Sequence, residues 1–287
     1  MNTYYTIKYW LKITRWNARR ASTALRWGSK GLNNSPIVFG NAMPKSGSHL
    51  IIQILHGLIG IGPFVNTGFP PVNRAEDNQK LPDDIVLNKI QNMRPGDIGY
   101  GYIGANEQFI SALTQAGRAT VFVYRDPRDM IISHIFYAIQ MQEKHWMRQY
   151  YIEELESMEE RINAAIVGVT KPGSELTPIR KRYQDYLGWL EQSAVHSIRF
   201  EDLILEQDNT LGGILDYLEI RGFIPKCQKS EALSKLKTAI KPQKSGTFRK
   251  ARPGNWREHF TENNIAMFKK ETGDLLIRLN YEQDLDW

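Results

Sequence analysis

A loop of small residues with a single lysine follows the first apolar segment of the chain. Residues 42–50 read AMPKSGSHL and lead into a helical pattern near 48–59. Small residues let backbone N–H groups turn toward a ligand, and the start of a helix adds partial positive charge. Lys45 adds a full charge, and the hydroxyls of Ser46 and Ser48 add donors. The loop predicts a phosphate-binding site, with an ordinary Ser/Gly turn as the alternative.

The loop does not match the P-loop of nucleoside-triphosphate enzymes. That motif reads G-x-x-x-x-G-K-[ST]. With Lys45 as the motif lysine, its two glycines would fall at Phe39 and Pro44. A metal-dependent P-loop kinase is therefore the weaker hypothesis, which ATP binding and magnesium dependence would support.

A second cluster of charged residues follows the clearest strand pattern, at 120–124. Residues 125–129 read RDPRD, and Ser133 lies two turns into the helical pattern beyond them. A guanidinium group is a planar fork of donors that suits phosphate. Arg125 and Arg128 therefore predict a second phosphate contact at this strand end, unless they only form ion pairs with the neighbouring aspartates.

Both segments resemble motifs of the PAPS-dependent sulfotransferase family, in the family's order. Residues 44–48 resemble the P-K-S-G-T loop that holds the 5′-phosphosulfate of the donor, 3′-phosphoadenosine 5′-phosphosulfate (PAPS). Arg125 and Ser133 match the arginine and serine of R-[DN]-P-[RK]-D-x-x-x-S, which bind the 3′-phosphate. Residues 244–257 (KSGTFRKARPGNWR) resemble the R-K-G-x-x-G-D-W-K loop that closes over the nucleotide, although such a basic stretch is also typical of a solvated charge run.

The resemblance implies transfer of a sulfuryl group from PAPS to an acceptor hydroxyl of a small molecule, glycan or lipid. Lys45 would be catalytic, neutralising charge on the leaving phosphate oxygen during in-line attack. Phe200 would lie near adenine, although it is equally typical of a core aromatic. The implied donor-binding residues are Lys45, Ser46, Gly47, Ser48, His49, Arg125, Ser133, Phe200, Arg249 and Lys250. Leu50, Ala251 and Asn255 depart from the family pattern, which has tryptophan, glycine and aspartate there.

The general base departs most from the family pattern. Many members carry a histidine in G-H-[LI]-P after the second strand, where this chain has Tyr102. A tyrosine with its ordinary pKa of about 10 is a poor base, so His145 and Glu107 are further candidates beside Tyr102 itself. Without a base the chain would be a catalytically weak or silent nucleotide-binding protein, which is the alternative to an active enzyme.

From residue 36 onward, apolar runs alternate with helical patterns. Strand patterns cover 37–40, 97–103, 120–124 and 195–200, and helical patterns cover 48–59, 127–140 and 176–192. This alternation predicts an α/β fold of three layers, with a central, mainly parallel sheet flanked by helices and a P-loop-like nucleotide site beyond the strand ends. Long loops at 62–96 and 141–175 are expected to frame the acceptor pocket.

The N-terminal segment differs in charge from the rest. A turn-rich break at 31–36 predicts an arm, 1–35, and a sulfotransferase domain, 36–287. The arm holds seven of the chain's 37 basic residues and no acid, which leaves 30 basic against 31 acidic residues beyond it. At helical spacing, one row is basic (Lys8, Lys12, Arg15, Arg19, Arg26, Lys30) and another is apolar (Ile7, Trp10, Leu11, Ala18, Ala21, Leu25). This pattern predicts peripheral membrane contact through residues 1–30, or docking of the apolar row on this protein or on a second subunit.

Composition and charge exclude several further kinds of partner and site. Because the charge excess is confined to the arm, nucleic acid is not an expected partner. Cys227 is the single cysteine, so no internal disulfide forms and a cytoplasmic location is expected, at the membrane surface if the arm binds lipid. No ligand spacing predicts a metal site, and no apolar stretch is long enough to span a bilayer. The oligomeric state does not follow from the sequence.

Overall fold

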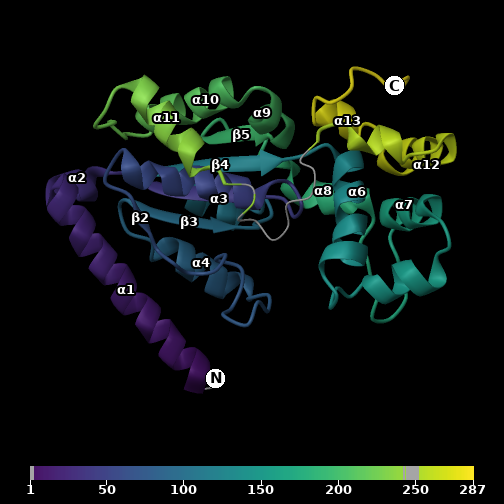
Figure 1. Ribbon diagram of the computed structural model, residues 1–287, viewed down its shortest axis with the longest axis horizontal. Coiled ribbons are helices and arrows are strands. Elements are labelled where there is room, and N and C mark those ends of the chain that lie inside the picture. The colour runs from purple at the N-terminus through teal and green to yellow at the C-terminus, as the bar shows by residue number, and fades with distance from the viewer. Residues whose placement is uncertain (1–2, 242, 244–251) are drawn as a thin grey trace.

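One parallel sheet of five strands forms the centre of the protein (Figure 1). The computed structural model describes residues 3–241, 243 and 252–287. The strands are β1 (Ile37–Ala42), β2 (Val65–Asn66), β3 (Asp97–Gly101), β4 (Arg118–Tyr124) and β5 (Val195–Arg199), in the spatial order β2-β3-β1-β4-β5. Every neighbouring pair is parallel. The predicted α/β architecture is confirmed.

Helices connect the strands and cover both faces of the sheet. They are α1 (Thr3–Trp27), α2 (Ser29–Asn34), α3 (Ser48–Gly57), α4 (Asp83–Gln91), α5 (Glu107–Thr114), α6 (Pro127–Phe136), α7 (Met158–Val167), α8 (Ile179–Leu187), α9 (Phe200–Leu205), α10 (Gln207–Ile220), α11 (Lys229–Ala239), α12 (Glu262–Thr272) and α13 (Leu275–Arg278). Shorter 3₁₀ or π-helical turns are η1 (Leu58–Gly60), η2 (Tyr137–Met141), η3 (Tyr150–Glu154) and η5 (Asn255–Glu258). Among the described helices, none is both long enough and apolar enough to cross a membrane.

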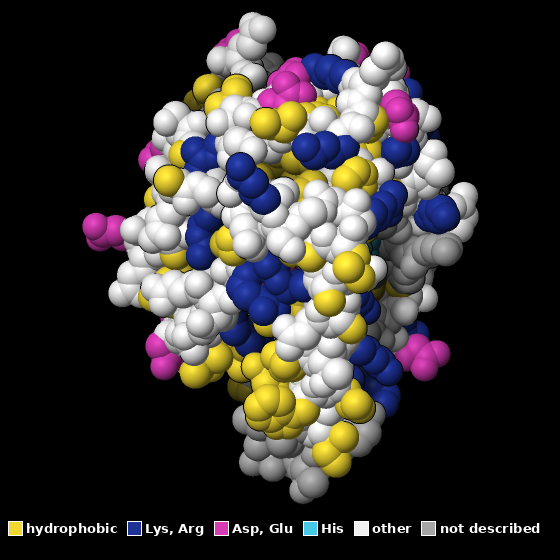
Figure 2. Space-filling view, turned by 90° about the vertical axis from the view of Figure 1, so that its left-hand side faces the viewer, with side chains coloured by type: hydrophobic (Ala, Val, Ile, Leu, Met, Phe, Trp, Pro, Cys, Tyr) yellow, Lys and Arg dark blue, Asp and Glu magenta, His cyan; other side chains and the backbone are white. Residues whose placement is uncertain are grey.

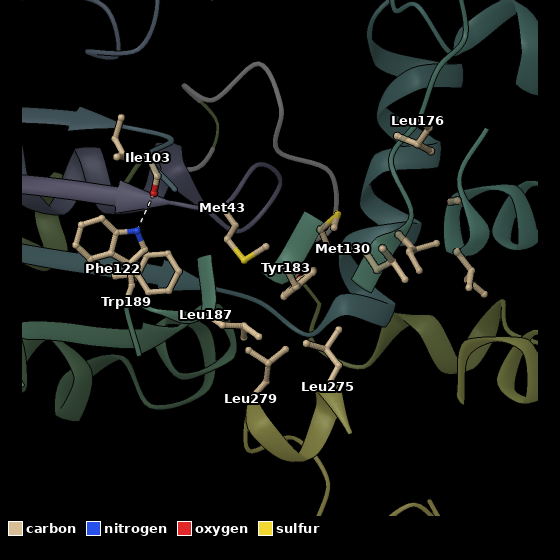
Figure 3. Close-up of a cluster of buried hydrophobic side chains, with 14 of the residues drawn as sticks. Met43, Ile103, Phe122, Met130, Leu176, Tyr183, Leu187, Trp189, Leu275 and Leu279 are labelled. Atoms are coloured by element: carbon tan, nitrogen blue, oxygen red, sulfur yellow. Dashed lines mark hydrogen bonds between the residues drawn. The ribbon is translucent and has the colours of Figure 1, made fainter. Parts of the chain in front are cut away.

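The strands are apolar on both faces because each face carries its own core. Val38 packs with α3, α9, α10 and α11, whereas the next residue, Phe39, packs with α4, α5 and α8. Successive side chains of a strand point to opposite faces, so one continuous apolar run serves two cores. The core that contains Phe39 continues beyond the strand ends and includes residues of α6, α7, α12 and α13. In this part of the core, Met43, Tyr183 and Leu275 lie close together (Figure 3).

Three segments differ from the predicted elements. The helix expected at 176–192 is shorter, because Pro178 caps its first residue and Gly188 its last. The predicted loop at 62–96 contains β2 and α4, and the predicted loop at 141–175 contains α7. The last helix had a local signal, since Ser157 and Glu160 form a capping box at its start.

The arm docks on the sheet edge through a face that is not its apolar row. Trp16 Nε1 and Arg20 Nη1 donate to the buried carboxylate of Asp97 at 2.9 and 2.7 Å, and Lys12 Nζ pairs with Glu76 at 2.7 Å. The expected break at 31–36 is largely occupied by α2. The apolar row does not pack on the body of this protein and faces solvent instead.

Candidate donor-binding site

The loop after β1 has the backbone of an anion-binding turn. Lys45 and Gly47 adopt left-handed conformations, with φ of 67° and 89°, which a residue other than glycine seldom adopts. Gly47 is required here for a second reason, since a Cβ at this position would lie 2.5 Å from Cδ2 of Phe200. Gly47 then caps α3 without any side-chain hydrogen bond.

Several donors of this loop are unsatisfied. The backbone N–H groups of Lys45, Gly47, Ser48 and His49 donate to no other residue that the structure describes. The hydroxyl of Ser46 is fully buried and likewise has no partner among the described residues. Buried donors without partners are costly, and a group of them at a helix start attracts an anion. This arrangement supports the predicted phosphate site.

The ammonium group of Lys45 lies over the ring of Tyr137, with Nζ 3.5 Å from the ring centroid. Burial, together with the positive charge of Arg125, lowers the pKa of Lys45 from 10.5 to about 7. Because its surroundings disfavour the protonated form of Lys45, a bound anion would stabilise that form strongly.

Arg125 brings the second predicted cluster to the same place. Its Nη1 donates to the backbone carbonyl of Lys45 at 3.3 Å, and its guanidinium lies 4.5 Å from the ring centroid of Phe200. Its Nη2 lies 3.9 Å from Oδ2 of Asp129. The Nε group is buried and has no partner among the described residues. Arg125 therefore keeps a donor free beside the loop, as a phosphate contact requires.

Other predicted donor residues surround this pair. Ser133 is half-buried on α6, one turn beyond Asp129 and so on the same side of the helix. Phe200 is buried beneath Gly47 and covered by Arg125, so it supports both anion-binding elements. His49 lies at the start of α3 with part of its side chain exposed, and the burial of the remaining part, together with the charge of Lys45, lowers its pKa. Arg249 and Lys250 lie outside the described residues.

Arg128 is structural rather than a phosphate contact. Its guanidinium pairs with Asp126 at 2.7 Å and with Glu282 at 2.6 Å. It packs on the rings of Trp256 and Trp287, at 4.2 and 4.5 Å from their centroids, and these two rings meet edge-on with their centroids 5.9 Å apart. The ion-pair alternative therefore holds for Arg128, which ties the C-terminal segment to α6.

Asp129 also binds the backbone near the end of the basic segment at 244–257. Its two carboxylate oxygens accept the N–H groups of Gly254 and Trp256, both at 2.8 Å. From the sequence, Asp129 was expected only as an ion-pair partner of a neighbouring arginine. These bonds fix the start of η5 next to Arg125.

Tyr102 lies beside the anion-binding loop, where the resemblance expects the base. Its hydroxyl donates to Oγ of Ser48 at 3.0 Å. Its backbone is held by the Asn73 amide, with bonds of 3.1 and 3.2 Å. The next residue, Ile103, is held by Asn41 and by Nε1 of Trp189 (Figure 3). These hydrogen bonds were not predicted. The polar Asn41 inside an apolar strand did indicate them, since a buried amide needs hydrogen-bond partners.

His145 belongs to an aromatic cluster next to Lys45. Its ring stacks on Trp146 at 4.0 Å and meets Tyr137 edge-on at 5.6 Å. Burial and the charge of Lys45 lower its pKa to about 4, so its ring is neutral near pH 7. Nδ1 accepts the N–H of Met147 at 3.2 Å. The proton of the neutral ring is therefore on Nε2, which makes this nitrogen a donor and not a base.

Glu107 is the first residue of α5 and is exposed to solvent. A carboxylate in the first turn interacts favourably with the helix dipole, which accounts for its position. Among the described residues, no group of three or more histidine, cysteine or acidic side chains could hold a metal ion.

The chain resembles solved structures in fold and matches one family model. The comparison with curated sequences gives no match. Mouse sulfotransferase SULT7A1, complexed with 3′-phosphoadenosine 5′-phosphate (PAP), superposes with a TM-score of 0.57 at 14% identity, over 89% of this chain and 93% of that one. Retinol dehydratase with androsterone and PAP gives 0.56 at 14% identity, over 86% and 83%. Retinol dehydratase with retinol and PAP gives 0.53 at 15% identity, over 86% and 84%. These structures are similar in fold.

A family model described as a sulfotransferase domain matches residues 118–279. The match spans β4, β5 and all the helices from α6 to α13. It covers more than half of the sequence and includes the Arg125 motif. The chain therefore belongs to the sulfotransferase family.

Proposed function

We propose that this chain transfers the sulfuryl group of PAPS to the hydroxyl of an organic acceptor. One observation carries the proposal: the unsatisfied donors of the loop at 45–49 and the free Nε of Arg125 lie side by side at the carboxyl ends of β1 and β4. Two adjacent anion sites fit a donor that has a phosphosulfate at one end and a 3′-phosphate at the other.

Two sets of residues bind the two anionic ends of the donor. The loop N–H groups, with Ser46 and Ser48, bind the 5′-phosphosulfate, and Arg125 with Ser133 binds the 3′-phosphate. In the transfer step the acceptor oxygen forms a bond to sulfur while the bond from sulfur to the phosphate oxygen breaks. PAP leaves and the hydroxyl proton is released. Lys45 stabilises the charge that develops on the leaving oxygen.

Tyr102 acts as a positioning residue in this proposal. By donating to Oγ of Ser48, it directs the hydroxyl hydrogen of Ser48 away from itself and toward the anion. His145, neutral and protonated on Nε2, donates a hydrogen bond at the acceptor side. A loose transition state for sulfuryl transfer needs little help from a base, by analogy with phosphoryl transfer.

The acceptor side is lined by aromatic rings. Tyr137, His145 and Trp146 form a continuous cluster next to Lys45, and the Trp146 side chain is exposed. Such rings favour an acceptor with an apolar or planar body. We propose a small-molecule alcohol or phenol, the class to which the androsterone and retinol of the similar structures belong.

Transfer to a panel of phenols, sterols, other alcohols and sugars tests the proposed function. With PAPS and no added metal, mass spectrometry should detect an acceptor that gains one sulfuryl group. PAP binding without turnover on any acceptor would instead favour a silent nucleotide-binding protein.

The Tyr102→Phe variant separates positioning from base catalysis. Because Phe cannot donate to Ser48, we expect kcat to fall about three- to tenfold, as for the loss of one indirect hydrogen bond. The pH profile of kcat should keep its shape, since no titrating base is removed. Loss of an ionisation limb in the profile, or a fall of more than about 10³-fold, would identify Tyr102 as the base.

The affinity for PAP should depend on pH through Lys45. The free protein holds the pKa of Lys45 at about 7, and a bound anion raises it, so binding above pH 7 requires uptake of a proton. We expect the Kd to be lowest below pH 7 and to rise by up to about tenfold per pH unit above it. Titration calorimetry in buffers of different ionisation enthalpy measures this uptake. Lys45→Arg, whose charge does not titrate in this range, should show none.

A further inference from the structure

Helix α1 presents an apolar row to solvent. Ile7, Trp10, Leu11 and Leu25 are 56%, 63%, 52% and 90% exposed. They recur at helical spacing, with small or hydroxyl side chains between them on the same side. Figure 2 shows apolar side chains gathered on this helix, with Lys and Arg side chains close by.

The orientation of this row is fixed from the opposite side of the helix. Trp16 and Arg20 bond to the buried carboxylate of Asp97. The guanidinium of Arg94 packs on the ring of Trp16, 3.7 Å from its centroid. It also donates to Oδ1 of Asn17 at 2.9 Å. The helix therefore cannot turn its apolar row onto the body without breaking buried bonds.

Free cations lie along one edge of the row. Lys8 and Lys12 both pair with Glu76, whose single negative charge offsets one of their two positive charges. Arg15, Arg26 and Lys30 are exposed and form no ion pair with any residue in the described part of the chain. At about 100° per residue, Arg15 and Arg26 fall beside the apolar row and not opposite it. The arm contains no acidic residue that would offset them.

We propose that α1 binds the surface of an anionic phospholipid membrane. An exposed apolar row with Trp, bordered by Lys and Arg, fits the boundary between acyl chains and anionic headgroups. Charge disfavours pairing of this row with the same row of a second copy, because two arms of seven basic residues and no acid would repel each other. The apolar side chains that Figure 2 shows on this helix face the left-hand side of Figure 1, whereas the strands point to the right. The donor site at the carboxyl ends of the strands therefore stays open to solution when the arm is bound.

Co-sedimentation with vesicles tests this proposal on the full chain. We expect the protein to bind phosphatidylcholine vesicles that contain about 30 mol % phosphatidylserine, and not pure phosphatidylcholine. Leu11→Glu combined with Leu25→Glu should weaken binding at least about tenfold, because it places charge in the apolar row. Arg15→Gln combined with Arg26→Gln should weaken it about 25-fold, at about fivefold per cation.

A matched control uses apolar side chains that are equally exposed elsewhere. Ile220 and Ile224 are 83% and 74% exposed at the end of α10 and just after it, and replacing both by Glu should leave vesicle binding unchanged. No binding of the wild type to anionic vesicles overturns the proposal, as does binding that survives the Leu11 and Leu25 changes. A dimer in ultracentrifugation that these changes dissociate, without vesicle binding, would show a second copy as the occupant.

Discussion

Replacing Lys45 by Ala should lower kcat for sulfuryl transfer by about 10³-fold, or about 4 kcal/mol of transition-state stabilisation. Its ammonium is the cation held over Tyr137 at the centre of the loop, where charge develops on the leaving phosphate oxygen. Since the loop N–H groups remain, PAP affinity should fall far less than kcat. Initial rates with a sulfated-product readout, together with PAP titration, measure both quantities.

Lys144→Ala is the matched control for this experiment. Lys144 is an exposed lysine directly before His145, so the change removes the same charge near the site without touching the loop. We expect less than a threefold effect on kcat, since exposed charges are screened. Equal losses of kcat in the two variants would mean that the general field of the site, and not a specific contact of Lys45, drives the reaction.

Replacing Arg128 by Ala should cost about 3–5 kcal/mol of the free energy of unfolding. The guanidinium is 2% exposed, so its loss leaves Asp126 and Glu282 as uncompensated charges. The change also removes the cation that packs on the rings of Trp256 and Trp287. For a chain of this size we expect the Tm to fall by about 6–20 °C, measured by calorimetry or circular dichroism.

An exposed ion pair provides the comparison for Arg128. Arg278 lies 3.9 Å from Glu191, and both side chains are largely exposed. Arg278→Ala should change the free energy of unfolding by less than about 1 kcal/mol. Arg128→Lys should still destabilise the protein, because an ammonium cannot reproduce the planar fork that pairs with both Asp126 and Glu282. A change below about 1 kcal/mol for Arg128→Ala would contradict the structural role.

The sheet and its site loop followed from sequence because the local signals were strong. Apolar strands buried on both faces, such as 37–40 and 120–124, predict a parallel sheet. The loop at 42–50 joins a strand to a helix in the order that an anion site needs. The meeting of Lys45 with Arg125 followed from the family motifs and from their positions after predicted strands, since the carboxyl ends of parallel strands share one edge of the sheet.

Contacts between distant segments could not be predicted in this way. The bonds from Asp129 to Gly254 and Trp256 span more than 120 residues, and no local pattern encodes them. The face through which the arm docks was not predicted, for a related reason. Whether a row of side chains faces the body depends on a buried acid such as Asp97, which lies on a different element and pairs with Trp16 and Arg20.

Titration of PAP into the protein without magnesium tests the central claim, that the loop at 45–49 and Arg125 together bind a nucleotide with two anionic ends. We expect wild type to bind with a Kd in the micromolar range or below, and Arg125→Ala to weaken binding by at least about 100-fold, or about 3 kcal/mol. Absence of binding to folded wild type, or equal binding by both proteins, would contradict the account and direct attention to ATP with magnesium.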